Sequence, residues 1–264
     1  MMTLQIERHG DVTRLRMSSV RTRAASLDVS TYVVRGVMID AGFARARSEL
    51  LRAVREIGVR GVILTHWHED HAGNVIDFDA LKIPVAMRRE TETILRERPD
   101  IQLYRRVVWG WPPRLTHGSW DFDTDGLQTI HTPGHSDDHQ VVWDPGTRTL
   151  FSGDLWLGVR SRVLHSTEDP YQILESLRRV ALLEPERMFD AHRGFIDDPV
   201  LAINAKIDWL GETMEKIAGR VRRGQSDRQI VREVLGGEEL TGYVSRGDYS
   251  RRNLVRAVRR RVER

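Results

Sequence analysis

The chain has 264 residues, of which 40% are hydrophobic and 30% charged, and its formal net charge is +3. Because it contains no cysteine, it can form no disulfide, no thiolate metal site and no cysteine nucleophile. No apolar run has the length that a bilayer span needs, and the N-terminus lacks the pattern of a signal peptide. We therefore expect a cytoplasmic globular protein with no membrane partner.

Strand and helix patterns alternate along most of the chain. Residues 1–40 alternate as β-strands do, residues 48–57 have the single apolar face of a helix, and residues 59–64 form an apolar run typical of a buried strand. Residues 100–120 look irregular and contain many aromatic side chains. A helix predicted at 169–183 is flanked by further strand patterns. This alternation indicates a layered α/β architecture.

The pattern becomes almost wholly helical after residue 198, with helices predicted at 200–223, 227–235 and 250–262. We therefore expect a catalytic domain over residues 1–198 and a helical C-terminal extension over residues 199–264, packed on the catalytic domain. The extension is basic, because residues 219–264 include thirteen arginines and only six acidic residues. Such a surface is either solvated or attracts nucleic acid, an acidic substrate or a partner.

Residues 65–71, with the sequence THWHEDH, follow an apolar strand and offer four metal ligands within six residues. Without cysteine, imidazole and carboxylate groups must hold any transition metal, and they suit zinc, iron or manganese. Three more residues of these types follow other strand-like runs, where a loop-edge site on a sheet scaffold would gather them. The residues that we expect to hold metal are His66, His68, Asp70, His71, His135, Asp154 and His192.

The order of these residues, HxHxDH followed by His, Asp and His, resembles the metallo-β-lactamase superfamily. The segment HTPGHSDDH is most similar to glyoxalase-II-like hydrolases and the beta-lactamase-like protein two branch. The resemblance implies a four-layer αββα sandwich with the metals at one edge between the two sheets. It further implies one metal on His66, His68 and His135, a second metal on Asp70, His71 and His192, and Asp154 as the bridging carboxylate.

The resemblance also implies a role for Asp40, which matches the early aspartate of the superfamily in the segment VMIDAG. Asp40 would orient a ligand or its loop through hydrogen bonds. The alternative is an aspartate that only forms the turn before Ala41 and Gly42.

Two divalent ions, zinc by default with iron or manganese as alternatives, would activate a bridging water. We predict a hydrolase in which this hydroxide attacks the carbonyl of an ester, thioester or lactone in a small-molecule acyl substrate, while Asp70 orients the nucleophile. Two other activities stay open. One is a metal-dependent phosphodiesterase or ribonuclease, which the basic helices would serve, and the other is an iron-dependent oxidoreductase similar to persulfide dioxygenases.

Substrate contacts are expected from residues near the last two ligands and from the aromatic segment. An arginine at such a place could pair with an anionic substrate group. The candidates are Trp156, Arg160, Arg162 and Arg193. The aromatic residues Tyr104, Trp109 and Trp111 would either form a pocket wall or pack at the edge of a core. We expect no chemical role for the isolated histidines His9, His117, His131, His139 and His165. The sequence leaves the oligomeric state open, a homodimer included.

Overall fold

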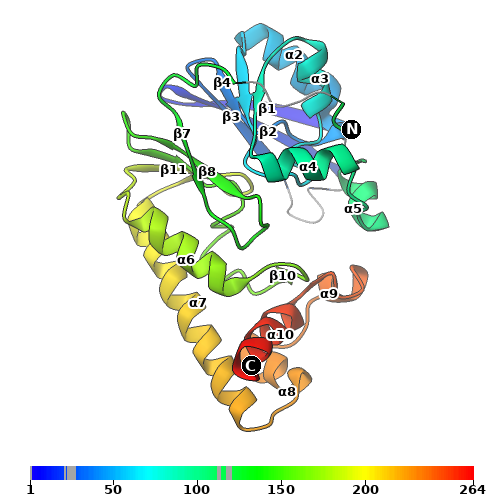
Figure 1. Cartoon of the computed structure of the whole chain (residues 1–264), viewed down its shortest axis with the longest axis vertical. Coiled ribbons are helices and arrows are strands. Elements are labelled where there is room, and N and C mark those ends of the chain that lie inside the picture. The colour runs from blue at the N-terminus through cyan, green and yellow to red at the C-terminus, as the bar shows by residue number, and fades with distance from the viewer. Residues whose placement is uncertain (1, 21, 23–27, 112–113, 117–120) are drawn as a thin grey trace. The chain divides into compact units, whose positions relative to one another are not determined.

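The structure is a computed structural model of the chain, and it describes residues 2–20, 22, 28–111, 114–116 and 121–264 (Figure 1). The chain forms two compact units. Unit 1 comprises Met1–His131, Asp138–Asp154 and Arg187–Ile196, and unit 2 comprises Thr132–Asp137, Leu155–Glu186 and Asp197–Arg264. Among the described residues, no helix combines the length and the apolar character that crossing a membrane requires.

Unit 1 is built on two sheets, each of mixed direction. The first has the order β1 (Met2–His9), β2 (Val12–Ser19), β3 (Val29–Val34), β4 (Val37–Ile39), β5 (Gly61–Ile63) and β6 (Val85–Ala86). Its strands are antiparallel from β1 to β4 and parallel from β4 to β6. The second has the order β12 (Gly194–Ile196), β11 (Arg187–Asp190), β9 (Thr149–Phe151), β8 (Gln140–Asp144) and β7 (Gln128–His131). In this sheet β11 and β9 are parallel, and the other pairs are antiparallel.

The first sheet of unit 1 contributes to two separate cores, because successive residues of a strand point to opposite faces. On one face, Val62 of β5 shares a buried cluster with Leu50 and Phe78 from the helices. On the other face, the next residue, Ile63, shares a cluster with Phe189 of the second sheet. The helices of this unit are α2 (Arg47–Ile57), α3 (Val75–Ala80), α4 (Arg89–Glu97) and α5 (Leu103–Val108), with a 3-10 turn, η1, at Ala44–Ala46. Unit 1 thus has a helical layer, a sheet and a second sheet, in the order of the first three layers of the predicted sandwich (Figure 1).

Unit 2 is mainly helical and contains one short antiparallel strand pair. Its elements are β10 (Leu164–His165), α6 (Pro170–Ala181), α7 (Pro199–Arg222), α8 (Asp227–Leu235), α9 (Leu240–Val244), β13 (Tyr249–Ser250) and α10 (Arg251–Val262), and β10 pairs with β13. Two helix starts have strong sequence signals. The side chain of Asp169 accepts hydrogen bonds from the first amides of α6, and Ser226 with Gln229 forms a capping box at the start of α8.

The long elements lie where the sequence predicts them, and the short ones explain the differences. The helices α2, α6, α7, α8 and α10 match their predicted ranges within two residues. Residues 100–120 are not wholly irregular, because α5 forms within them, and α9 is absent from the prediction. A helix of five or six residues is too short to repeat an apolar face, so periodicity does not reveal it.

The predicted boundary between residues 198 and 199 lies at the start of α7, next to the point where the last segment of unit 2 begins. Unit 2 also takes in segments 132–137 and 155–186, which we expected in the catalytic domain. The C-terminal helices thus cluster with parts of the preceding chain. Their assignment as a separate extension stays a prediction.

Phe189 offers a test of the core between the two sheets. Its side chain is 1% exposed and stacks on Phe151 with 5.4 Å between ring centroids. We expect Phe189→Ala to lower the free energy of unfolding by about 3–5 kcal/mol, because it leaves a cavity between the sheets. Urea unfolding measures this loss. The matched control is Phe195→Ala on β12, where the side chain is 37% exposed, and an equal loss in both variants would contradict the described core.

Candidate metal centre

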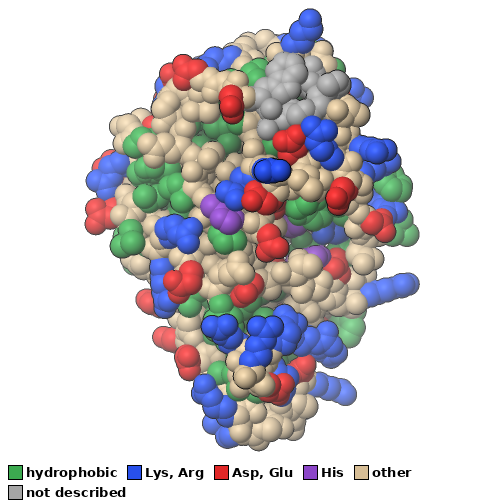
Figure 2. Space-filling model, viewed as in Figure 1, with side chains coloured by type: hydrophobic (Ala, Val, Ile, Leu, Met, Phe, Trp, Pro, Cys, Tyr) green, Lys and Arg blue, Asp and Glu red, His purple; other side chains and the backbone are tan. Residues whose placement is uncertain are grey.

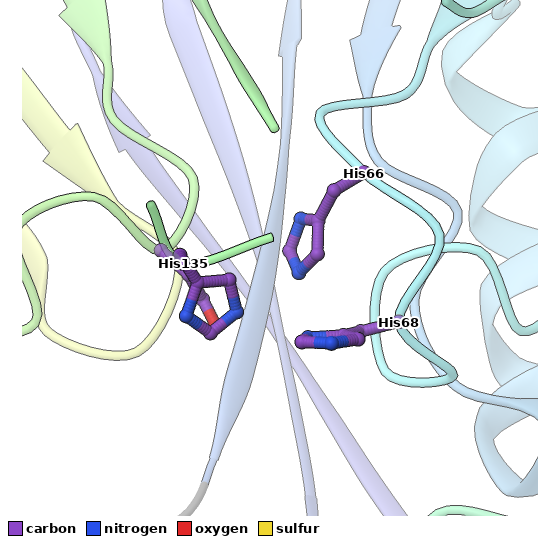
Figure 3. Close-up of side chains that lie close together, drawn as sticks. His66, His68 and His135 are labelled. Atoms are coloured by element: carbon purple, nitrogen blue, oxygen red, sulfur yellow. The ribbon is translucent and has the colours of Figure 1, made fainter. Parts of the chain in front are cut away.

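The structure places the seven predicted ligands in two adjoining groups. His66, His68, His135 and Asp154 form the first, and Asp70, His71 and His192 form the second; within each group one atom of every residue lies within 4.8 Å of the others. Figure 3 labels His66 and His68, which lie on one loop of unit 1 with 4.6 Å between their ring centroids, and His135 of unit 2. All of these residues except His135 belong to unit 1.

Asp154 adjoins both groups, which is the arrangement that a bridging carboxylate requires. Its Oδ1 lies 3.3 Å from Nε2 of His71 and 3.3 Å from Nε2 of His192. Asp70 approaches the same two rings, with Oδ2 at 3.8 Å from Nε2 of His71 and 3.6 Å from Nε2 of His192. Two imidazoles therefore point their Nε2 atoms at two carboxylates.

The loop after β5 is held in place through Asp40 and Thr65. The amide and the hydroxyl of Thr65 both donate to the carboxylate of Asp40, at 2.7 and 2.9 Å. Asp40 has a left-handed backbone with φ of 66°, and its amide donates to the carbonyl of Ile63. The turn is closed where the amides of His71 and Ala72 donate to the carbonyl of His68. Asp40 thus fixes the start of the loop that contains four of the donors.

Each of four histidines in the centre has an oxygen atom facing its Nδ1. Nδ1 of His71 lies 2.8 Å from the carboxylate of Asp40, and Nδ1 of His66 lies 3.0 Å from the hydroxyl of Thr65. Nδ1 of His192 lies 3.1 Å from the backbone oxygen of Asp28. In unit 2, Nδ1 of His135 lies 2.5 Å from the carboxylate of Glu168. Hydrogen bonds of this kind set the tautomer with the proton on Nδ1, which leaves Nε2 to bind a metal.

The pKa shifts of His71, His192 and Asp154 indicate that the buried carboxylates of the cluster require positive charge beside them. Burial lowers the pKa of His71, but the carboxylates of Asp154, Asp40 and Asp70 outweigh it and raise this pKa well above its usual value. Burial likewise opposes the carboxylates around His192, whose pKa still rises to about 9. Burial would raise the pKa of Asp154, but His192 and His71 hold it well below the ordinary range. Bound protons supply the positive charge in the metal-free protein, and divalent cations fit the same donors.

Some residues that support the centre escaped the sequence analysis, and His139 is the clearest case. Its Nε2 accepts a hydrogen bond of 3.1 Å from the amide of Asp154, so His139 positions the backbone of a donor. That it has no chemical role of its own stays a prediction. Only a glycine leaves room for this contact at position 153, because a Cβ there would lie 2.7 Å from the same Nε2. The φ of Gly153 is 51°, which also favours glycine. The signal was the position of His139 four residues after His135 in one motif. His117 lies outside the described residues.

Buried acidic residues also support the loop of the first histidines. Asp138 accepts hydrogen bonds from the amide of Trp67 at 2.9 Å and from the hydroxyl of Thr91 at 2.7 Å. Glu69 forms a two-pronged ion pair with Arg105, with both N–O distances 2.7 Å. Burial raises the pKa of Glu69, and the guanidinium of Arg105 opposes that effect. Both acidic residues have partners far along the chain, which no local pattern reveals.

The predicted substrate contacts are less well supported. Trp156 is 8% exposed, and its indole N–H donates to the carbonyl of Ala202 on α7 within unit 2. Arg162 donates to the carbonyl of Leu235 at 3.5 Å. Arg160 and Arg193 are exposed. Within unit 2, therefore, Trp156 serves as a packing residue, and a substrate role for the arginines stays a prediction.

The aromatic segment does not form the expected pocket wall as a group. Trp109 is buried in the core of unit 1, with its ring centroid 5.2 Å from that of Phe43. Trp111 is 56% exposed, and the guanidinium of Arg106 lies 4.3 Å from its ring centroid. Tyr104 is half-buried on α5. The structural interpretation of Trp109 therefore replaces the pocket interpretation.

A family model described as the metallo-beta-lactamase superfamily matches residues 26–192. The chain belongs to this superfamily. The match covers every donor of the centre, and with it the predicted family, fold class and enzyme class are confirmed. The enzyme class that this match supports is that of the metallo-beta-lactamase superfamily hydrolases.

The chain is also similar to two curated relatives and two solved structures. It is 28% identical to a Beta-lactamase-like protein 2 homolog of Drosophila melanogaster, over 78% of this chain and 74% of that protein. It is 27% identical to an Atrochrysone carboxyl ACP thioesterase of Passalora fulva, over 78% of this chain and 63% of that protein. Metallo-beta-lactamase family protein TTHA1429 from Thermus thermophilus matches 98% of this chain and 91% of its own, with a TM-score of 0.64 and 18% identity. TTHA1623 in a di-iron-bound form matches 66% and 92%, with a TM-score of 0.55 and 27% identity.

Metal binding should release protons, because nearby carboxylates raise the pKa of His192 and of His71 in the absence of a cation. The pKa of His192 is raised to about 9 in the metal-free protein, so a metal that takes its Nε2 must displace that proton. Titration calorimetry with zinc at pH 7, in buffers that differ in ionisation enthalpy, counts the protons. We expect net release and an affinity that rises from pH 6 to pH 9. A binding enthalpy that does not depend on the buffer would contradict this charge balance.

Asp40 provides a test of how the centre is oriented. Asp40→Asn removes the charge that faces Nδ1 of His71 and should weaken metal binding by about 10–100-fold. Competition with a chelator measures the affinity. Asp144→Asn is the matched control, since Asp144 is also buried in unit 1 and its carboxylate pairs with Arg35 instead. Equal metal affinities for the two variants would show that Asp40 does not support metal binding.

Proposed function

We propose that the chain is a dinuclear hydrolase that opens the carbonyl–heteroatom bond of an ester, thioester or lactone in a small acyl substrate. The observation that carries the proposal is the pairing of two donor groups around Asp154, with an oxygen atom facing Nδ1 of four histidines. A relative named for its thioesterase activity supports the thioester as the first substrate class to test.

The seven donors would be shared between two metal ions. His66, His68 and His135 would hold one ion, Asp70, His71 and His192 a second, and Asp154 both. Divalent ions at these positions would supply Lewis acidity and a water of lowered pKa. Zinc is the first candidate, and iron and manganese suit the same nitrogen and oxygen donors.

The surrounding residues would orient the ligand histidines and the attacking water. Asp40, Thr65 and Glu168 face Nδ1 of three ligand histidines and so direct their Nε2 atoms to the metals. Asp70 would hold a proton of the attacking water, because its carboxylate lies beside His192 at the more exposed side of the cluster. The side chains of Asp70 and His192 retain 10% and 12% exposure, whereas that of His71 is fully buried.

Loss of either of two donors should abolish turnover. We expect His66→Ala and Asp154→Ala to lower kcat/KM by at least about 100-fold, because removing a ligand costs more than removing its orienting partner. Thioester hydrolysis can be followed by titrating the released thiol, and the protein adds no background because it contains no cysteine. His9→Ala is a control in the same unit, since His9 lies against Phe189 and Phe195 rather than among the donors.

The same assay should include lactones, nitrophenyl esters, a phosphodiester and RNA. Faster turnover of the phosphodiester or RNA would replace the acyl substrate with the nuclease alternative. Iron in protein purified without added metal, together with oxygen consumption on a persulfide, would replace hydrolysis with the oxidoreductase alternative. Full thioesterase activity in protein freed of metal by a chelator would overturn the proposal.

A further inference from the structure

The C-terminal helices of unit 2 form an open pocket of about 310 Å³. Arg228 and Arg232 of α8, Tyr243 of α9 and Arg252 of α10 contribute to its lining, together with Glu238. A volume of this size is at the lower end of the range for small-molecule sites, roughly 300–1,000 Å³. Figure 2 shows Lys and Arg side chains gathered over these helices. All the lining residues fall between positions 226 and 252, so the pocket lies entirely within unit 2.

The three arginines of this pocket form no salt bridges among the described residues, unlike several arginines nearby on the same helices. Among the described residues, no salt bridge joins Arg228, Arg232 or Arg252 to a carboxylate. Other arginines on the same or adjacent helices are paired: Arg220 with Glu233, Arg251 with Glu239, and Arg259 with Asp227.

This arrangement carries an electrostatic cost. Arg228 and Arg232 stand four positions apart on one helix, where like charges repel each other. Arg252 adds a third positive charge to the same pocket. An anion bound among them would relieve this repulsion.

Glu238 contributes one negative charge to the lining and so offsets only one of the three arginines. Its oxygens are already engaged. Its carboxylate accepts hydrogen bonds from the hydroxyl of Ser250 and from the amide of Arg251 at the start of α10. The hydroxyl of Ser226 is likewise used, since it caps the start of α8. The three guanidinium groups therefore remain as charged donors for a ligand, and their three positive charges oppose one negative charge.

We propose that this pocket binds the phosphate group of a small phosphorylated molecule. Guanidinium groups match phosphate oxygens with two-pronged hydrogen bonds, and a dianionic phosphate balances the excess charge better than a single carboxylate does. The ring of Tyr243, whose residue is 71% exposed, offers an apolar face for the organic part of the ligand. Extended single-stranded nucleic acid is disfavoured, because its sites combine a basic groove with a series of stacking aromatic rings.

Calorimetry on the metal-loaded full chain tests the site, with inorganic phosphate and adenosine 3′,5′-bisphosphate as probes. We expect Arg232→Gln/Arg252→Gln to weaken binding of the bisphosphate by about tenfold or more, since two charged hydrogen-bond donors are lost. The matched control is Arg222→Gln/Arg260→Gln, which removes two exposed arginines of α7 and α10 that do not line the pocket. This control should change the affinity less than about twofold. Arg228→Gln provides an independent single variant, expected to weaken binding in the same direction.

His66→Ala separates this pocket from the metal centre, where phosphate can also bind. The proposal requires bisphosphate binding to persist in His66→Ala. It is overturned if His66→Ala loses bisphosphate binding while the arginine variants keep it. It is also overturned if both double variants lose affinity equally, or if the wild-type chain binds neither probe. It is also overturned if a single-stranded oligonucleotide binds more tightly than the bisphosphate and the two double variants weaken that binding equally, because this pattern describes a diffuse basic surface.

Discussion

The structure depends on a charge constraint at His71, a fully buried imidazole with the carboxylates of Asp40, Asp70 and Asp154 close to it. Buried carboxylates are stable only when positive charge and hydrogen bonds compensate for lost hydration. Protons on His71 and His192 supply that charge in the metal-free chain. The loops around the centre are arranged to keep these groups together, and divalent cations meet the same requirement with their own charge.

The scaffold meets this constraint by placing the donors at the ends of short buried strands. The loop after β5 is bonded to Asp40, and the turn after β9 allows the amide of Asp154 to reach His139 across Gly153. The buried pair of Glu69 and Arg105 ties this loop to α5. Orientation therefore comes from backbone turns and hydrogen bonds to Nδ1, while the two cores of unit 1 provide a rigid base.

The sequence predicted the family, the fold class and the grouping of seven donors, because HxHxDH concentrates the chemistry in a short segment whose spacing is specific. It did not reveal partners that only folding brings close, such as Glu168, which is 33 positions from His135. It also left open whether Trp109 lines a pocket or packs in a core, since an aromatic cluster in sequence does not distinguish the two. Composition located the basic C-terminal region, but only the folded helices show which arginines share a pocket.

The central claim is that two ions occupy the paired donor groups, and anomalous X-ray diffraction tests it most directly. Crystals of protein purified without added metal would be measured on either side of the zinc, iron and manganese absorption edges. We predict two adjacent anomalous peaks, one at His66 and His68 and the other at Asp70, His71 and His192. A single peak at this cluster, or none, in crystals of protein that is active as purified would contradict the dinuclear account.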